Sequence, residues 1–195
     1  MPTNTSATGG YLTPTNTQTD DQALQRFIHA VLCGLTGLEA ALVRPLWQAN
    51  PAPTPDISVD WLAYGIASRR ADNDTFLKMN AAGTQTTQQR HEELEYRLMF
   101  YGPNCLGNAA ELRDAILIQQ NQDVLYQSGM AIVDASDITH APELVNERYF
   151  NRCDIVLTVR RELNRVYSIF NFTAAGGTIK ANRAESTLTR GWQTS

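Results

Sequence analysis

One stretch of the sequence partly matches a zinc-protease motif. His91-Glu92-Glu93-Leu94-Glu95 begins like HExxH, but Glu95 occupies the position of the second histidine ligand. Two ligands four residues apart share a face on a helix, whereas the alternating apolar residues from Leu94 onward favour a strand. We therefore expect no metal site here and interpret the three glutamates as a solvated or interfacial strip.

Other patterns that could support catalysis are also incomplete. Residues 174–178 contain two adjacent glycines but lack the spacing and the Gly-Lys-Ser/Thr ending of a phosphate-binding loop. No GxSxG nucleophile elbow occurs in the sequence. Cys105 could meet His91 or His140 in the folded chain, but a cysteine nucleophile needs a paired base, and the sequence gives no evidence of one. We expect no catalytic residues and no cofactor.

The three cysteines do not indicate a covalent or metal framework. Cys33, Cys105 and Cys153 are widely spaced, and their number is odd. Closely spaced cysteine pairs are typical of disulfide scaffolds and zinc sites, and the sequence contains none. We expect three free thiols, buried or partly buried, and no bound metal.

The composition favours a soluble protein that assembles with others. The length of 195 residues suits one domain, and 43% hydrophobic residues are enough for a core. No run approaches about 18 apolar residues, and no signal peptide is evident, so we expect a cytoplasmic product without a membrane partner. The net charge of -4 gives no electrostatic reason to expect nucleic-acid binding. All but two of the 16 basic residues are arginines, which are enriched at protein interfaces.

The long stretch over residues 147–171 organises the predicted fold. Cys153, Ile155, Leu157 and Val159 are apolar at every second position, with mostly polar residues between them. A period of two places alternate side chains on opposite faces of an extended chain, so the stretch predicts a half-buried strand. It is much longer than a usual strand of roughly 5–6 residues, which indicates a bend, a bulge or an overhang.

Periodicity and turn residues place the remaining elements around this strand. The stretch 91–101 is ambiguous, because its Glu and Leu content favours a helix while its alternation favours the strand that we choose. Trp61 is expected in the core. The predicted elements are a helix over 19–34, an edge or interrupted strand over 42–48, a loop over 50–55, a strand over 59–68, a polar connection over 69–87, a strand over 91–101, a helix capped by Asn108, a helix over 121–128, a strand over 130–134, a loop over 135–143 and a hairpin that turns at 174–177.

This order of elements predicts an α+β fold. One mixed or antiparallel sheet covered by helices is the most economical arrangement, with a long C-terminal strand and a β-hairpin extension. The expected domain covers residues 19–181. Residues 1–18 and 182–195 are polar and are expected to be flexible tails.

Three groups of motifs lie in order along the chain. They are Arg44-Pro45-Leu46-Trp47-Gln48-Ala49-Asn50-Pro51 with Pro55-Asp56, Asp60-Trp61 and Gly65-Ile66; Arg90-His91-Glu92-Glu93-Leu94-Glu95 with Phe100-Tyr101-Gly102-Pro103-Asn104; and Pro142-Glu143-Leu144-Val145-Asn146-Glu147-Arg148-Tyr149 with Asp154, Arg160-Arg161-Glu162 and Tyr167. Together they resemble the neck or tail-terminator family of long-tailed bacteriophages. The resemblance covers roughly residues 20–180.

The resemblance implies a structural role in the virion. Terminators of this kind are small α/β subunits that form a homohexameric ring on the tail tube, stop its polymerisation and join it to neck or connector proteins. The tail sheath is a further partner if the tail is contractile. A closed head-to-tail ring ends growth, and a net negative charge suits a channel through which DNA slides without specific binding. The alternatives are another head–tail connector or tail tube protein and, as a third class, a small accessory enzyme.

The polar strand faces supply the hypothetical interface. We expect the faces within 92–97 and 152–162 to provide subunit contacts or the channel wall, and Trp47 to be an exposed interface aromatic. The end of the long strand and the hairpin are expected to reach a neighbouring subunit or the tail tube. The candidate interface residues are Arg44, Trp47, Glu93, Glu95, Arg97, Arg152, Arg160, Arg161, Arg165 and Tyr167.

Overall fold

The computed structural model describes residues 10–16, 21–145, 147–169, 175–183 and 186–194. The chain divides into two compact units. We call Thr17–Phe76 with Gln89–Asn164 the sheet unit, and Met1–Asn16 with Leu77–Gln88 and Arg165–Ser195 the hairpin unit. Among the described residues the elements are α1 (Asp21–Thr36), a 3-10 turn η1 (Ala40–Leu42), β1 (Val43–Pro45), β2 (Trp61–Ala71), β3 (Phe76–Met79), β4 (Gln85–Tyr101), α2 (Cys105–Ala115), α3 (Gln119–Tyr126), β5 (Met130–Ala135), β6 (Thr139–His140), β7 (Glu143–Val145), β8 (Arg148–Phe150), β9 (Arg152–Ser168), β10 (Ala175–Arg183) and β11 (Ser186–Thr194).

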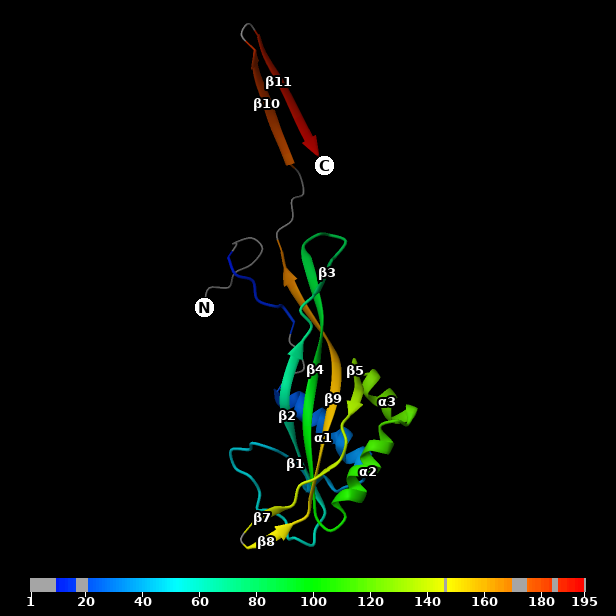
Figure 1. The fold of residues 1–195 in the computed structure, drawn as a ribbon. Coiled ribbons are helices and arrows are strands. Elements are labelled where there is room, and N and C mark those ends of the chain that lie inside the picture. The colour runs from blue at the N-terminus through cyan, green and yellow to red at the C-terminus, as the bar shows by residue number, and fades with distance from the viewer. Residues whose placement is uncertain (1–9, 17–20, 146, 170–174, 184–185, 195) are drawn as a thin grey trace. The chain divides into compact units, whose positions relative to one another are not determined.

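One mixed sheet forms the centre of the fold. Its main strand order is β1-β2-β4-β9-β5 (Figure 1). In addition, β3 pairs with β4 and β6 pairs with β9. Strand β1 is parallel to β2, whereas β2 is antiparallel to β4 and β5 is antiparallel to β9. The sheet and the long C-terminal strand confirm the predicted α+β class.

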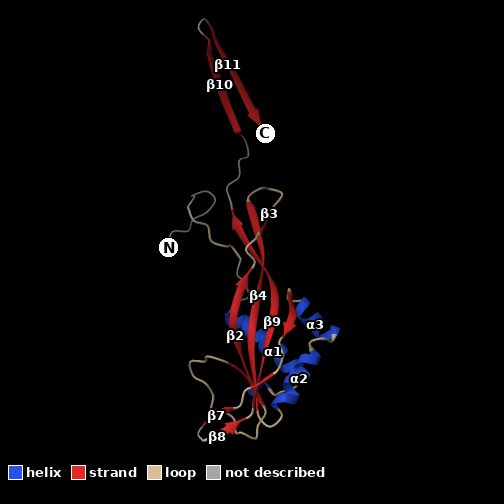
Figure 2. Cartoon of the chain, viewed as in Figure 1, coloured by secondary structure: helices blue, strands red, loops and turns tan. Residues whose placement is uncertain are grey.

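The helices cover one face of this sheet (Figure 2). In α1, Leu24, Ile28 and Leu32 recur every four residues and are buried, which is the apolar stripe of a helix that packs on a sheet. Helix α1 ends at Thr36, and Gly37 follows with a φ of 66°, the left-handed conformation that favours glycine after a helix. The predicted start at Thr19 lies outside the described residues.

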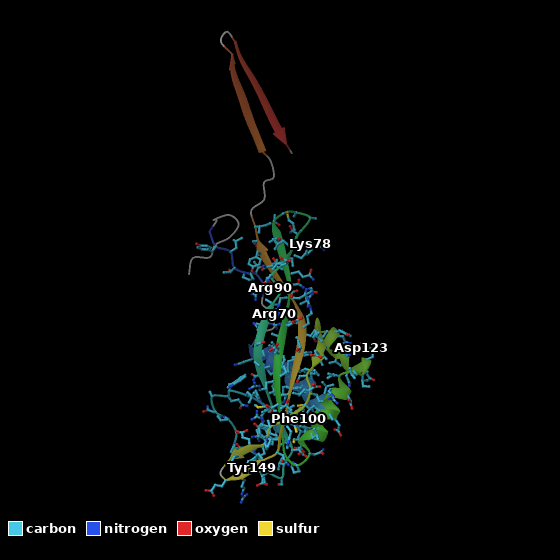
Figure 3. The ribbon with its side chains drawn as sticks, in the orientation of Figure 1. Arg70, Lys78, Arg90, Phe100, Asp123 and Tyr149 are labelled. Atoms are coloured by element: carbon cyan, nitrogen blue, oxygen red, sulfur yellow. The ribbon has the colours of Figure 1, made fainter. Side chains whose placement is uncertain are left out.

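The core joins alternate residues of β4 and β9 to the helices. Figure 3 places Phe100, which is fully buried, among the side chains of the sheet. The buried set is Leu94, Tyr96, Leu98 and Phe100 on β4, Cys153, Ile155, Leu157 and Val159 on β9, and Ala109, Leu112, Ile116 and Leu125 around α2 and α3. Alternation in both strands therefore confirms the predicted half-buried strands and their apolar residues.

Helix α2 begins earlier than predicted. Its N-cap is Asn104, whose backbone N–H donates to the Asp60 carboxylate at 2.8 Å, and Asn108 lies one turn inside the helix. The capping spacing that starts at Asn108 was therefore the wrong signal. Helix α2 instead begins just after the turn at Gly102. The Gly102 N–H holds this turn in place by donating to the Asn151 carbonyl at 3.2 Å.

The connection predicted over 69–87 is wrong, because most of it is strand. Strand β2 continues to Ala71, β3 occupies Phe76–Met79, and β4 already begins at Gln85. All four side chains of β3 are exposed. A strand without a buried face need not alternate between apolar and polar residues, so the pattern used for prediction is absent here. The loop predicted over 135–143 likewise contains the short strand β6.

The C-terminal hairpin turns later than predicted. Gly176 and Gly177 lie inside β10 and pair with Gln193 and Trp192 of β11. Strand β11 occupies most of the segment 182–195 that was expected to form a tail. The β-hairpin extension is therefore present, but the chain reverses between Arg183 and Ser186 rather than at the two glycines.

The hairpin unit also contains backbone contacts of the N-terminal segment. Thr15 N–H donates to the Val166 carbonyl at 2.7 Å, and Val166 N–H donates to the Asn16 side chain at 2.8 Å. The end of β9 thus continues its pairing with residues that were expected to form a tail. Residues 1–9 of that predicted tail lie outside the described residues.

Gly102 provides a test of this local geometry. Its φ is 110°, and a Cβ would lie 2.4 Å from Asp60 Oδ1 and 2.7 Å from the Val59 carbonyl oxygen. Gly102→Ala should destabilise the protein by more than about 3 kcal/mol, because backbone strain of about 1–3 kcal/mol adds to this clash. Gly37→Ala is the control, since φ is also positive but no atom lies within 4 Å, and it should cost about 1 kcal/mol. Equal losses in urea unfolding would contradict the proposed clash.

Candidate assembly surface

The sheet presents a polar face opposite the helices. Because side chains alternate along a strand, residues between the buried positions of β4 and β9 lie on this side. We call it the charged face and define it by Glu93, Glu95 and Arg97 on β4 with Arg152, Asp154 and Arg160 on β9. All six side chains are exposed or half-buried.

Arg160 is held by two carboxylates from other segments of the sheet unit. Its Nη2 lies 2.9 Å from Asp72 Oδ2, after β2, and its Nη1 lies 3.2 Å from Glu93 Oε1 on β4. Each of these side chains is about 40% exposed, a degree at which ion pairs contribute roughly 0–1 kcal/mol. The arrangement orients the guanidinium more than it stabilises the fold.

Arg152 organises a second cluster at the other end of the charged face. Its Nε and Nη2 donate to both Asp154 carboxylate oxygens at 2.6 Å, and its Nη1 donates to Glu143 at 3.1 Å. The hydrogen bond to Asp154 is the main reason that the pKa of Arg152 is raised. Tyr101 also donates to Glu143, and burial, reinforced by that carboxylate, raises the pKa of Tyr101 to about 12. The cluster is therefore a pre-ordered patch of fixed charge.

Trp61 belongs to this cluster and not to the core, which corrects the expectation from the sequence. Its ring stacks on Tyr101 at 4.2 Å between centroids, and the side chain is only partly buried. Arg44 lies 5.8 Å from the Trp61 ring centroid, within the range of a cation–π contact. Arg44 thus contacts Trp61, which stacks on Tyr101, and Arg152 lies 6.0 Å from the centroid of the Tyr101 ring.

Arg161 lies on the face opposite Arg160, so its expected exposure on the polar face is not observed. It is 3% exposed and its Nε donates to the carboxylate of Glu92, which is 2% exposed. Arg69 of β2 lies 3.6 Å from the same carboxylate. Arg161 lies an even number of residues from Cys153 and Val159, so the alternation of side chains along a strand could have placed it on the helix-covered side.

Trp47 lies at the rim of a cavity beside α1. The cavity has a volume of about 320 Å³ and is lined by Leu46, Trp47, Tyr64, Tyr96 and others. Trp47 is 74% exposed and has a φ of 57°, a conformation unusual for a bulky residue. The Tyr96 hydroxyl is buried without a hydrogen-bond partner among the described residues. The expected exposure of Trp47 is confirmed.

The other candidates are placed less tightly. Glu95 accepts a hydrogen bond from Ser68 at 2.7 Å, whereas Arg97 is exposed and faces Gly65 in the strand register. Arg165 and Tyr167 belong to the hairpin unit, where the Tyr167 hydroxyl donates to Gln88 at 3.4 Å. Within the sheet unit, the candidates therefore fall into the groups around Arg152 and Arg160, with Arg161 on the opposite face.

The incomplete HExxH stretch forms no common site. His91 and Glu93 lie on the charged side and Glu92 on the covered side, as a strand requires. His91 lies 3.9 Å from Glu162, and Cys105 instead approaches His140, one of the two histidines considered from the sequence.

A family model described as phage neck terminator protein matches residues 22–183, which include the whole charged face. The chain belongs to this family. Its members are structural proteins of the phage neck, so the chain is a virion component that contacts other tail or neck proteins. This confirms the resemblance drawn from the motifs. A search of curated proteins finds no match. No helix in the described part of the chain has the length and apolarity needed to cross a membrane.

Removal of the buried carboxylate tests the inner ion pair. Glu92→Ala should destabilise the protein by about 3–5 kcal/mol, because it removes the carboxylate that compensates the buried charge of Arg161. Glu93→Ala is the matched control, since Glu93 is 35% exposed and its ion pair should contribute at most about 1 kcal/mol. Chemical unfolding of both variants measures the difference. Similar losses for both would show that Glu92 is not an essential buried partner.

Proposed function

We propose that the chain is a tail terminator whose six copies close into a ring on the end of the tail tube. The ring stops tube polymerisation and joins the tail to the neck or connector proteins. The observation that carries this proposal is the neck terminator family match, which spans both 17-residue strands, β4 and β9, and all other strands of the mixed sheet.

The two edges of the sheet support a head-to-tail arrangement. Strand β1 lies at one edge and β5 at the other, so the surfaces beside them differ in sequence and shape. Contact between two different surfaces is heterologous, and such contacts generate a closed ring when the rotation between subunits closes. A closed ring leaves no free lateral surface, which accounts for a defined end of growth.

The charged face supplies subunit contacts or the wall of the channel. Arg152 and Arg160 are already oriented by carboxylates, so little of their side-chain entropy remains to be lost on assembly. Charges of both signs alternate on it, whereas a DNA-binding surface concentrates positive charge. DNA can therefore pass such a wall without being held by its phosphates.

Trp47 and the C-terminal hairpin are further contact points. An exposed tryptophan is a frequent anchor of protein interfaces, and Trp47 adjoins a cavity into which a partner side chain can pack. Strands β10 and β11 form a sheet of two strands, an arrangement that is at best marginally stable alone in water. We propose that the hairpin is stabilised by contact with a neighbouring subunit or with the tail tube.

The capping activity can be tested directly with purified components. Substoichiometric amounts of this chain, relative to tail tube protein from the same phage, should yield short tubes that carry a ring at one end in electron micrographs. Tubes of unchanged length would contradict the terminator role. Incorporation along the tube would identify a tube protein, and rings that bind only the connector would identify another neck component.

Charge reversal at Arg97 tests the charged face in ring formation. Arg97→Glu should shift the purified protein from hexamer toward monomer by at least about tenfold in dissociation constant, because like charges then meet at the interface. Arg113→Glu is the control, since it makes the same charge change on an exposed position of α2. Native mass spectrometry compares the two. Unchanged hexamers for Arg97→Glu would exclude this position from the subunit contact.

A further inference from the structure

Three segments of the sheet unit bring Cys105, His140 and Cys153 together. Cys105 is the first residue of α2, His140 ends β6, and Cys153 lies near the start of β9. His140 and Cys153 are direct partners in the antiparallel β6–β9 register, so their side chains point to the same face. Cys105 and His140 are 35 residues apart in the sequence, and His140 and Cys153 are 13 residues apart. A search for metal-binding motifs by ligand spacing therefore does not find these three residues.

The three side chains present their ligand atoms to one another. The two Sγ atoms are 2.9 Å apart, and all three potential ligand atoms lie within 4.8 Å of one another. Both cysteines are almost fully buried, at 3% and 0% exposure, whereas His140 is exposed. The group therefore has an inner pair of sulfur atoms and an imidazole at the solvent side.

We propose that Cys105, His140 and Cys153 form a binding site for a thiophilic divalent cation, for which Zn²⁺ is the natural probe. Two thiolates and one imidazole are a common zinc ligand set, with distances of about 2.3 Å to sulfur and about 2.0–2.1 Å to nitrogen. A tetrahedral ion at those distances separates two sulfur atoms by about 3.8 Å. The thiols need to part by about 0.9 Å, and His140 closes from the solvent side, where a water molecule completes the fourth position.

Binding has a defined proton balance and a structural consequence. The cation displaces one proton from each thiol to solvent, so its affinity rises with pH. The ion links the start of α2 and the strand β6 to the base of β9. This link does not depend on ring formation. The pair of Cys33 and His29 on α1 differs from the proposed site in supplying two potential ligand atoms, 3.6 Å apart, instead of three.

Metal binding can be measured on the reduced full-length chain. Titration with Co²⁺ should give thiolate charge-transfer absorption and tetrahedral ligand-field bands that saturate at one equivalent, and Zn²⁺ should then displace the Co²⁺. His140→Ala should lower the affinity at least about tenfold without loss of fold, since His140 is exposed. Cys33→Ser is the matched cysteine control and should bind as the parent protein does.

Three results would overturn the assignment. The first is a reduced protein without the thiolate band, and the second is a band that Cys33→Ser abolishes while His140→Ala leaves it unchanged. The third is a Cys105–Cys153 disulfide in the isolated protein whose reduction restores no Co²⁺ binding. Circular dichroism of each variant shows whether the fold is retained, and His140→Ala leaves both buried cysteines in place.

Discussion

The buried ion pair between Glu92 and Arg161 joins the two long central strands at the point where their apolar pattern changes. From Leu94 to Phe100 and from Cys153 to Val159 the covered face is apolar, and the ion pair follows directly on that face. Removing two charges from water costs several kcal/mol for each ion, so the pair persists only in one well-matched geometry. A slip of one residue would turn every side chain to the other face and separate the two charges. The contact between these two charges therefore favours one register between the neighbouring strands β4 and β9.

This register determines what each face of the sheet can do. With β4 and β9 aligned, apolar residues meet α1, α2 and α3, while Arg160, Glu93 and Asp72 meet on the opposite side. The first face supplies most of the stability, because burial of apolar surface outweighs the small contribution of half-exposed ion pairs. The second face remains available for partners.

Alternation in the sequence was sufficient to predict the parts of the fold that have one buried face. Strand β9 and the strand character of 91–101 were predicted for this reason, whereas helix α1 was predicted from apolar residues that recur every three or four positions. The family resemblance followed from motifs that are local in sequence. Strand β3 has no buried face and left no such pattern. The meeting of Cys105, His140 and Cys153 depends on the sheet register, and the stacking of Trp61 on Tyr101 depends on the pairing of β2 with β4. Neither is visible from spacing along the chain. Arg161 was different, because it lies an even number of residues after the apolar positions Cys153 to Val159, and alternation along the strand already placed it on the covered face.

The central claim is that this chain forms the ring that ends the tail tube. The most direct measurement is a cryo-electron microscopy reconstruction of the neck of the virion that carries it. We predict a single closed ring of six copies between the tail tube and the connector, with the charged face at a subunit contact or at the channel. Copies distributed along the tube, or a neck without a sixfold ring of this chain, would contradict the account.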